Sequence, residues 1–177
     1  IVYHPKIVQQ LALHPGEIVI SYDKAWLPLW SERFENPLDD AETFRLQTNG
    51  QLRSIGANTR TVTDIEGQYM GLLKISPNGW QQIETLLDRL SEEKRNHLDM
   101  TSLLQLLLEE GTEINTVPTH GRWCEVDSET DLRLYEHMLH HNDWAHDWRY
   151  PQLFFSLRAG SVLQNAFLYL FQLAYLQ

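Results

Sequence analysis

An uninterrupted apolar run at residues 18–20 is the feature that most limits how this chain can fold. Such a run is typical of a strand covered on both faces, as in sheets flanked by helices. A helical segment, residues 5–13, precedes it and ends at Pro15-Gly16. Polar Tyr22 and Asp23 follow the run. Since open α/β sheets bind ligands at the carboxyl ends of their strands, Asp23 is a candidate site residue.

The rest of the chain alternates helical and extended patterns. Asn49-Gly50 predicts a hairpin between strands at residues 42–46 and 52–55. Further strands are expected at 69–75 and 122–126, and helices at 26–34, 78–90, 99–108 and 128–140. This order predicts an α/β fold in which a mixed sheet is flanked by helices.

Composition excludes some functions. The net charge is -10, from 24 acidic and 14 basic residues, whereas a nucleic-acid surface needs clustered Lys and Arg. The single cysteine, Cys124, cannot form an internal disulfide, and no signal peptide is evident, so we expect a cytoplasmic protein. A cationic or metal-bridged ligand suits this acidic chain better than nucleic acid does.

The composition changes near Arg149, which divides the chain into an expected domain at residues 1–148 and an apolar helical tail at 149–177. Apolar residues in the tail recur at helical spacing, but Arg158, Gln164 and the Gly160-Ser161 pair interrupt them. A membrane span is therefore disfavoured. We expect the tail to cover the sheet or to form a homodimer interface.

Glu125 and Asp127 are the most informative acidic pair. Two residues apart on the expected strand, they would project from the same face, where two carboxylates repel each other. A divalent cation or a cationic ligand would relieve that repulsion. The alternative is a solvent-facing pair at the edge of a sheet.

The motif Trp123-x-Glu125-x-Asp127, followed by a small residue and an acidic helix, resembles the closing motif of phosphocholine-type cytidylyltransferases. The resemblance implies that Asp127 binds the catalytic Mg²⁺ and that Glu125 faces the pocket for the head group. It also implies that residues 1–148 form the acceptor- and metal-binding portion, the C-terminal part of a Rossmann-like nucleotidyltransferase fold.

Two other blocks are similar to stretches of these enzymes, including those specific for 2-aminoethylphosphonate. One contains Asp23 and Trp26 and continues to Glu42, and the other is Ile65-Glu66 through Gly71, which leads into a strand of the acceptor pocket. The rings and acids in these blocks could surround an ammonium group, because aromatic faces and carboxylates both attract cations. The predicted substrate-binding residues are Asp23, Trp26, Tyr69, Glu125, Tyr22 and Glu66. Core packing for the rings and a helix cap for Asp23 are the alternatives.

The resemblance implies transfer of a nucleoside monophosphate from CTP to an amine-bearing phosphate or phosphonate, with Mg²⁺ as cofactor. Residues 1–177 contain no glycine-rich strand-to-helix loop with the Arg and Lys that would hold a triphosphate. We therefore expect weak or absent CTP binding and no turnover by these residues alone. The alternatives are a non-catalytic binding or dimerisation module and a sugar-phosphate nucleotidyltransferase.

Overall fold

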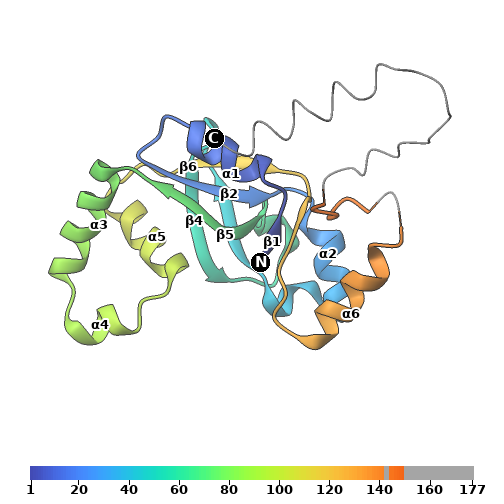
Figure 1. Cartoon of the computed structure of the whole chain (residues 1–177). Helices are drawn as coiled ribbons and strands as arrows, with labels where there is room; N and C mark the ends of the chain where they lie inside the picture. The colour runs from blue at the N-terminus through green and yellow to red at the C-terminus, as the bar shows by residue number, and fades with distance from the viewer. Residues whose placement is uncertain (142–143, 150–177) are drawn as a thin grey trace, which may run out of the picture.

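The computed structural model describes residues 1–141 and 144–149 (Figure 1). The predicted tail therefore lies outside the described residues, and the boundary at Arg149 stays a prediction. Within the described part, no helix is long and apolar enough to cross a membrane.

The centre of the molecule is a three-stranded mixed sheet in the order β5-β2-β6. Strand β2 (Ile18–Asp23) pairs antiparallel with β5 (Gln68–Ile75) and parallel with β6 (Asn115–Thr119). The apolar run at residues 18–20 is fully buried, as its pattern predicts. The mixed α/β prediction is confirmed.

Two smaller pairs of strands complete the extended structure. The predicted hairpin is formed by β3 (Glu42–Leu46) and β4 (Leu52–Asn58), and Gly50 in its turn has a φ of 82°, which glycine adopts at little cost. The second pair is formed by β1 (Val2–Tyr3) and β7 (Trp123–Cys124), which run antiparallel. These pairs extend the strand layer beyond the central sheet.

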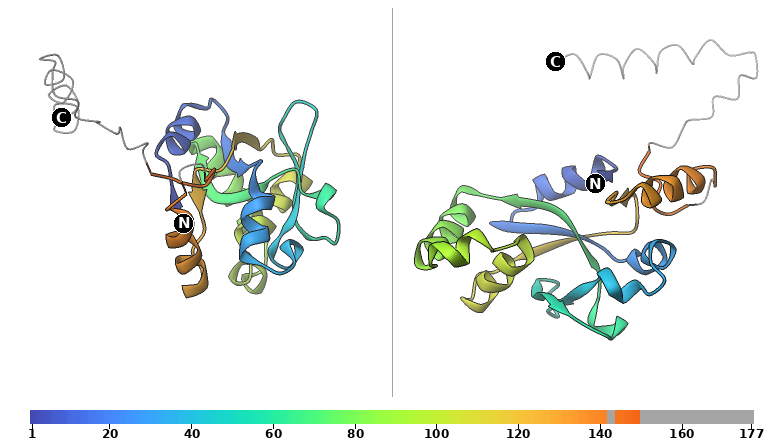
Figure 2. Two further views of the ribbon diagram at one scale, coloured as in Figure 1. Left: turned by 90° about the vertical axis from the view of Figure 1, so that its right-hand side faces the viewer. Right: turned by 90° about the horizontal axis from the view of Figure 1, so that it is seen from below.

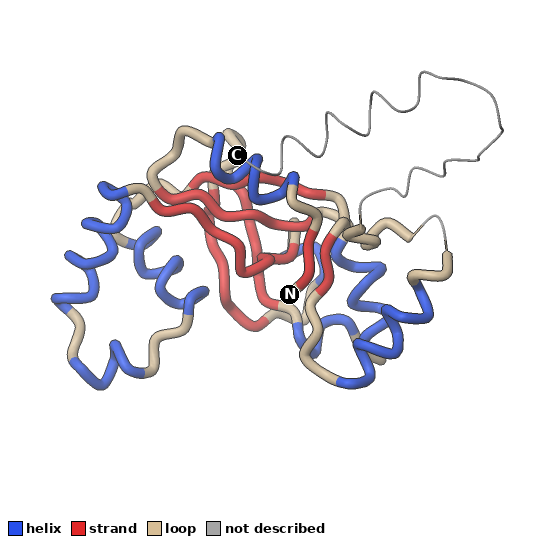
Figure 3. The backbone as a smooth tube through the Cα atoms, in the orientation of Figure 1, coloured by secondary structure: helices blue, strands red, loops and turns tan. Residues whose placement is uncertain are grey.

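Helices lie around the strands (Figure 3). Helix α1 (Lys6–Leu13) packs against β2 and β5, whereas α2 (Trp26–Arg33) and α6 (Glu129–Met138) contact each other at one end of the molecule (Figures 1 and 2). At the opposite end, α3 (Pro77–Arg89), α4 (Glu92–Asn96) and α5 (Met100–Glu109) follow one another, with α5 against β4. Short 3-10 turns at Pro37–Asp40 and Val62–Asp64 flank the hairpin.

Side-chain caps fix the helix starts. Ser76 accepts a hydrogen bond from the Gly79 backbone N–H and Asp99 accepts one from Ser102, so α3 and α5 begin close to their predicted starts. At α6, Ser128 and Asp131 form a complete capping box even though Asp131 stands where Glu or Gln is usual.

The strand predicted at residues 122–126 is shorter than expected. It ends at Cys124, so Glu125 and Asp127 lie beyond it in irregular backbone. Arg122 has a φ of 64°, and the partner strand β1 has only two residues, which limits the ladder. The Glu125 carbonyl instead accepts a hydrogen bond from the Tyr135 hydroxyl at 2.7 Å. The alternation of side chains along a strand, on which the prediction relied, therefore does not place Glu125 and Asp127 on the same side.

Candidate functional site

A buried arginine brings the predicted acids together. Arg33, the last residue of α2, has a side chain that is only 1% exposed. Its Nη2 lies 2.7 Å from Asp127, its Nε 3.0 Å from Asp131 and its Nη1 3.4 Å from Glu125. The repulsion between carboxylates that favoured a metal ion is thus relieved in this structure by a guanidinium.

Packing and hydrogen bonds hold this cluster in place. The Arg33 guanidinium carbon lies 5.0 Å from the ring centre of Trp30 and 4.9 Å from that of Phe34, within the range of cation–π attraction. Asp131 accepts further hydrogen bonds from the backbone N–H groups of Asp127 and Ser128. The α2 helix is thereby tied to the start of α6.

The same surroundings move the carboxyl pKa values in opposite directions. Burial and the neighbouring Asp127 charge raise the pKa of Glu125 above its ordinary value, against the opposing effect of Arg33. Burial also acts to raise the pKa of Asp131, but hydrogen bonds from Arg33, Asp127 and Ser128 outweigh it and hold that pKa below its ordinary value. Asp131 is therefore the more firmly ionised of these two acids.

Glu125 and Tyr69, two of the predicted substrate-binding residues, line one small cavity. The cavity has a volume of about 210 Å³ and is lined by residues of the hairpin, β5 and the start of α5. The Tyr69 hydroxyl is buried and is the only such side-chain N or O atom among the described residues without a hydrogen-bond partner. Burial raises the pKa of Tyr69 to about 12. The cavity also includes Glu42, Thr43, Phe44, Ile55, Gln68, Gly71 and Thr101.

The two other predicted rings lie in the core. Tyr22 is 2% exposed and stacks on Phe44 with ring centres 4.9 Å apart. Trp26 is 3% exposed and meets Trp30 edge-on at 6.2 Å. Neither residue lines the Tyr69 cavity in this conformation, so core packing accounts for both.

Asp23 is fully buried in a separate network. Its Oδ1 accepts hydrogen bonds from the backbone N–H groups of Ala25 and Gly121, both at 2.8 Å. Its Oδ2 accepts one from Trp123 Nε1 at 2.9 Å and lies 2.9 Å from His146 Nε2. Burial acts to raise the Asp23 pKa, but the hydrogen bonds from His146, Gly121, Trp123 and Ala25 hold it below its ordinary value. In this arrangement Asp23 joins the end of β2 to later parts of the chain.

Glu66 also has a protein partner. Its carboxylate accepts a hydrogen bond from the Leu46 backbone N–H at 2.5 Å, and its own N–H donates to the Phe44 carbonyl at 2.8 Å. These bonds fix the loop before β5 against β3. Glu66 is not among the residues that line the Tyr69 cavity.

The described residues offer a divalent metal only part of a coordination shell. They contain no group of three His, Cys, Asp or Glu side chains that could hold a metal ion. Asp127 is 61% exposed and carries a carboxylate, the ligand type that Mg²⁺ prefers. A single carboxylate suits Mg²⁺ when waters and substrate phosphates supply the other ligands.

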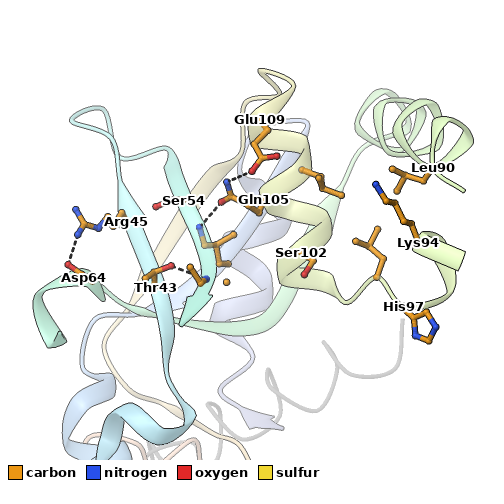
Figure 4. Close-up of a pocket in the computed structure, with 15 residues that line it drawn as sticks. Thr43, Arg45, Ser54, Asp64, Leu90, Lys94, His97, Ser102, Gln105 and Glu109 are labelled. Atoms are coloured by element: carbon orange, nitrogen blue, oxygen red, sulfur yellow. Dashed lines mark hydrogen bonds and ion pairs between the residues drawn. The ribbon is translucent and has the colours of Figure 1, made fainter. Parts of the chain in front are cut away.

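A larger cavity lies elsewhere, between the hairpin and α4–α5 (Figure 4). It has a volume of about 810 Å³ and shares Thr43 and Ile55 with the Tyr69 cavity. The Gln105 side chain accepts a hydrogen bond from the Ile55 backbone N–H and donates one to Glu109 across its wall. Sequence reasoning did not predict this cavity, because its residues come from segments with no recognisable motif.

Arg33 was also missed. The available signal was chemical: the predicted acidic pair requires a cation, and a basic residue, Arg33, lies in the last turn of the predicted helix at residues 26–34. Nothing in local spacing connects that helix with residues 125–131, which lie about 100 positions later. Only the fold brings the two together.

Comparison with known proteins identifies one curated relative and a solved structure of the same fold. The chain is 39% identical over 140 residues to the CTP:phosphoglutamine cytidylyltransferase of Campylobacter jejuni subsp. jejuni serotype O:2, a match that covers 76% of this chain and 55% of the relative. The inositol-1-phosphate CTP transferase from T. maritima aligns with a TM-score of 0.53 at 15% identity, covering 77% of this chain and 51% of that structure. No protein-family model matches.

These findings confirm the predicted resemblance to cytidylyltransferases and the nucleotidyltransferase fold. The chain spans about half the length of the relative and of the solved structure. The similarity therefore concerns about half of each of those two proteins.

Proposed function

We propose that this chain is the acceptor-binding portion of a cytidylyltransferase that transfers CMP from CTP to a small, amine-bearing phosphate or phosphonate. The observation that carries the proposal is the unpartnered hydroxyl of Tyr69, which lines one cavity together with Glu125, in a chain 39% identical to a cytidylyltransferase over 140 residues. A buried hydroxyl normally has a partner, so a ligand is the natural partner here.

The cavity sets limits on the acceptor. A volume of about 210 Å³ corresponds to roughly seven waters at about 30 Å³ each, which suits a small head group better than a whole nucleotide. Glu42 and Glu125 supply carboxylates and Tyr69 supplies an aromatic ring, and both kinds of group attract an ammonium. The Tyr69 hydroxyl can donate to a ligand oxygen. A phosphorylated amino acid has both an ammonium group and phosphate oxygens, so phosphoglutamine is a candidate acceptor together with 2-aminoethylphosphonate and phosphocholine.

In the reaction, an oxygen of the acceptor phosphate attacks the α-phosphorus of CTP. A new P–O bond forms, the bond to the β-phosphate oxygen breaks, and pyrophosphate leaves with that electron pair. The residues of this chain orient the acceptor and exclude water, so no protein nucleophile is required. Asp127 would provide one carboxylate to Mg²⁺, which when bound stabilises negative charge on the phosphoryl groups.

The nucleotide site is proposed to come from outside these 177 residues, because they contain no glycine-rich phosphate-binding loop. Alone, the chain should bind the acceptor but neither hold CTP tightly nor turn over. Micromolar binding of CTP by the isolated chain, measured by calorimetry, would contradict the proposal that the nucleotide site lies outside these residues.

Calorimetric titration of the chain with each acceptor tests the proposed pocket. We expect phosphoglutamine, 2-aminoethylphosphonate or phosphocholine to bind, and Tyr69→Phe to weaken binding by about three- to tenfold through the loss of one hydrogen bond. Tyr3→Phe is the matched control, because Tyr3 is 36% exposed and lies outside the cavity lining.

Two results would count against the assignment. If a sugar phosphate binds and the amine-bearing compounds do not, the acceptor class is wrong. If Tyr69→Phe and Tyr3→Phe bind the acceptor equally well, the cavity is not the acceptor site.

A further inference from the structure

The Arg33 cluster contains three carboxylates that are held with different firmness. Asp131 is the most firmly held: its side chain is 8% exposed, and Arg33 Nε, two backbone N–H groups and the Ser128 hydroxyl all bind it. Breaking these contacts would leave a buried charge without partners, which is costly. Asp131 and Arg33 therefore form the fixed part of the cluster.

Asp127 is held by much less. Its side chain is 61% exposed, and its ion pair runs to Arg33 Nη2 alone, at 2.7 Å. The same nitrogen also lies 3.3 Å from Asp131, so it keeps a partner if Asp127 moves away. Exposed ion pairs contribute little free energy, so this contact can be given up at small cost.

Arg33 itself would stay in place after losing Asp127. Its Nε remains bonded to Asp131 and its guanidinium remains against the rings of Trp30 and Phe34. Glu125, at 3.4 Å from Nη1, also remains within reach. Arg33 thus remains a fixed cation, and Asp127 can leave it and return without moving it.

We propose that Arg33 is a positioning residue that pairs with Asp127 when no metal is bound and from which Asp127 is released when it binds a divalent cation. This inference rests on the proposed function only in taking Asp127 as the metal ligand. Because one carboxylate cannot pair fully with both cations, Arg33 weakens metal binding and keeps Glu125 and Asp127 together until a metal arrives.

Mn²⁺ binding to the purified chain, measured by the loss of the free-ion electron paramagnetic resonance signal, tests the competition without any enzyme assay. Removing the competing charge in Arg33→Met should tighten Mn²⁺ binding by about two- to fivefold, the gain expected from losing a weak ion pair, and adding Asp127→Asn to that variant should abolish the gain. Arg45→Met is the matched control: it removes the Arg45–Asp64 ion pair, and we expect no change in affinity.

Because Arg33→Met could fail to fold, the wild-type chain offers a second measurement. Titration with Mg²⁺ should shift the NMR resonances of the Asp127 carboxyl carbon while the Arg33 Nε–H resonance, bonded to Asp131, stays where it is. Equal Mn²⁺ affinities of wild type and a folded Arg33→Met variant would overturn the proposal. So would movement of the Arg33 Nε–H resonance together with Asp127.

These outcomes are separable from the proposed function. A chain that shows the competition but binds none of the proposed acceptors would retain the Arg33 mechanism and refute the proposed function. A chain that binds an acceptor through Tyr69 but shows no competition would refute the Arg33 mechanism and retain the proposed function.

Discussion

Asp23 and Asp127 are both acids that sequence reasoning placed at a ligand site, and the fold treats them in opposite ways. Asp23 is completely buried and has four protein partners, whereas Asp127 is 61% exposed and is paired through one arginine nitrogen. A carboxylate whose lone pairs are filled by protein donors is part of the framework. One held by a single exposed contact remains available to a ligand.

The largest expected effect is on Asp23. Asp23→Asn should lower the free energy of unfolding by about 3–5 kcal/mol, because it removes a buried charge that four partners are arranged to receive. Asp127→Asn is the matched comparison and should change it by less than about 0.5 kcal/mol. Urea denaturation followed by tryptophan fluorescence measures both, and similar losses for the two variants would break the distinction.

Lowering the pH should reduce the stabilisation that Asp23 and Asp131 each give the folded state. Both pKa values are held below the ordinary value of 3.8, so the stabilisation is complete above that pH and is lost as the pH falls through the lowered folded values. Glu125 acts in the opposite sense because its pKa is raised in the folded state. Its contribution to the free energy of unfolding is present below its ordinary pKa of 4.5 and is lost as the pH rises through the raised pKa of the folded state.

Free energies of unfolding measured between pH 2 and 6 test whether stability falls as the pH is lowered. Wild type should lose stability towards the acid end, and a variant carrying Asp23→Asn and Asp131→Asn should lose less. A double variant as acid-sensitive as wild type would show that other groups control the transition.

A smaller loss is expected from Asp131→Asn. The amide cannot pair with Arg33 as a charge and caps α6 less well, so we expect a loss of about 1–3 kcal/mol. Glu129→Gln is a suitable control on the same helix turn, since Glu129 is 76% exposed in its pair with Arg133. If both substitutions have the same effect on the unfolding midpoint, Arg33 is not anchored through Asp131.

The smallest effect on stability is expected at Tyr69. Its hydroxyl has no protein partner, so Tyr69→Phe should leave the free energy of unfolding within about 0.5 kcal/mol of wild type or raise it slightly. Acceptor affinity should fall all the same. A clear loss of stability in the thermal unfolding midpoint would mean that the hydroxyl has a structural partner.

Much of the fold could be predicted from local patterns. The buried run at residues 18–20, the Asn49-Gly50 turn and the caps Ser76 and Ser128 all mark features that the structure contains. Strand β6 was missed because its sequence, Asn115–Thr119, is mostly polar and includes Pro118. Proline is tolerated there because β6 is an edge strand of the central sheet.

The candidate site was predictable only in part. Glu125 and Tyr69, both predicted to bind the substrate, share a cavity, and their binding role stays a prediction. The partners of Asp23 at Gly121, Trp123 and His146 and the pairing of Arg33 with Asp127 depend on contacts across about 100 residues or more. Local sequence patterns cannot distinguish a carboxylate that is fully hydrogen-bonded within the protein from one that can bind a ligand.

The most direct test of the account is acceptor-dependent release of pyrophosphate from CTP by a chimera of the Campylobacter relative. In it, the matching 140 residues of that enzyme are replaced by those of this chain. We predict turnover with an amine-bearing phosphate or phosphonate, weakened by Tyr69→Phe and abolished by Asp127→Asn. A folded chimera that binds CTP but releases no pyrophosphate with any of these acceptors would contradict the assignment.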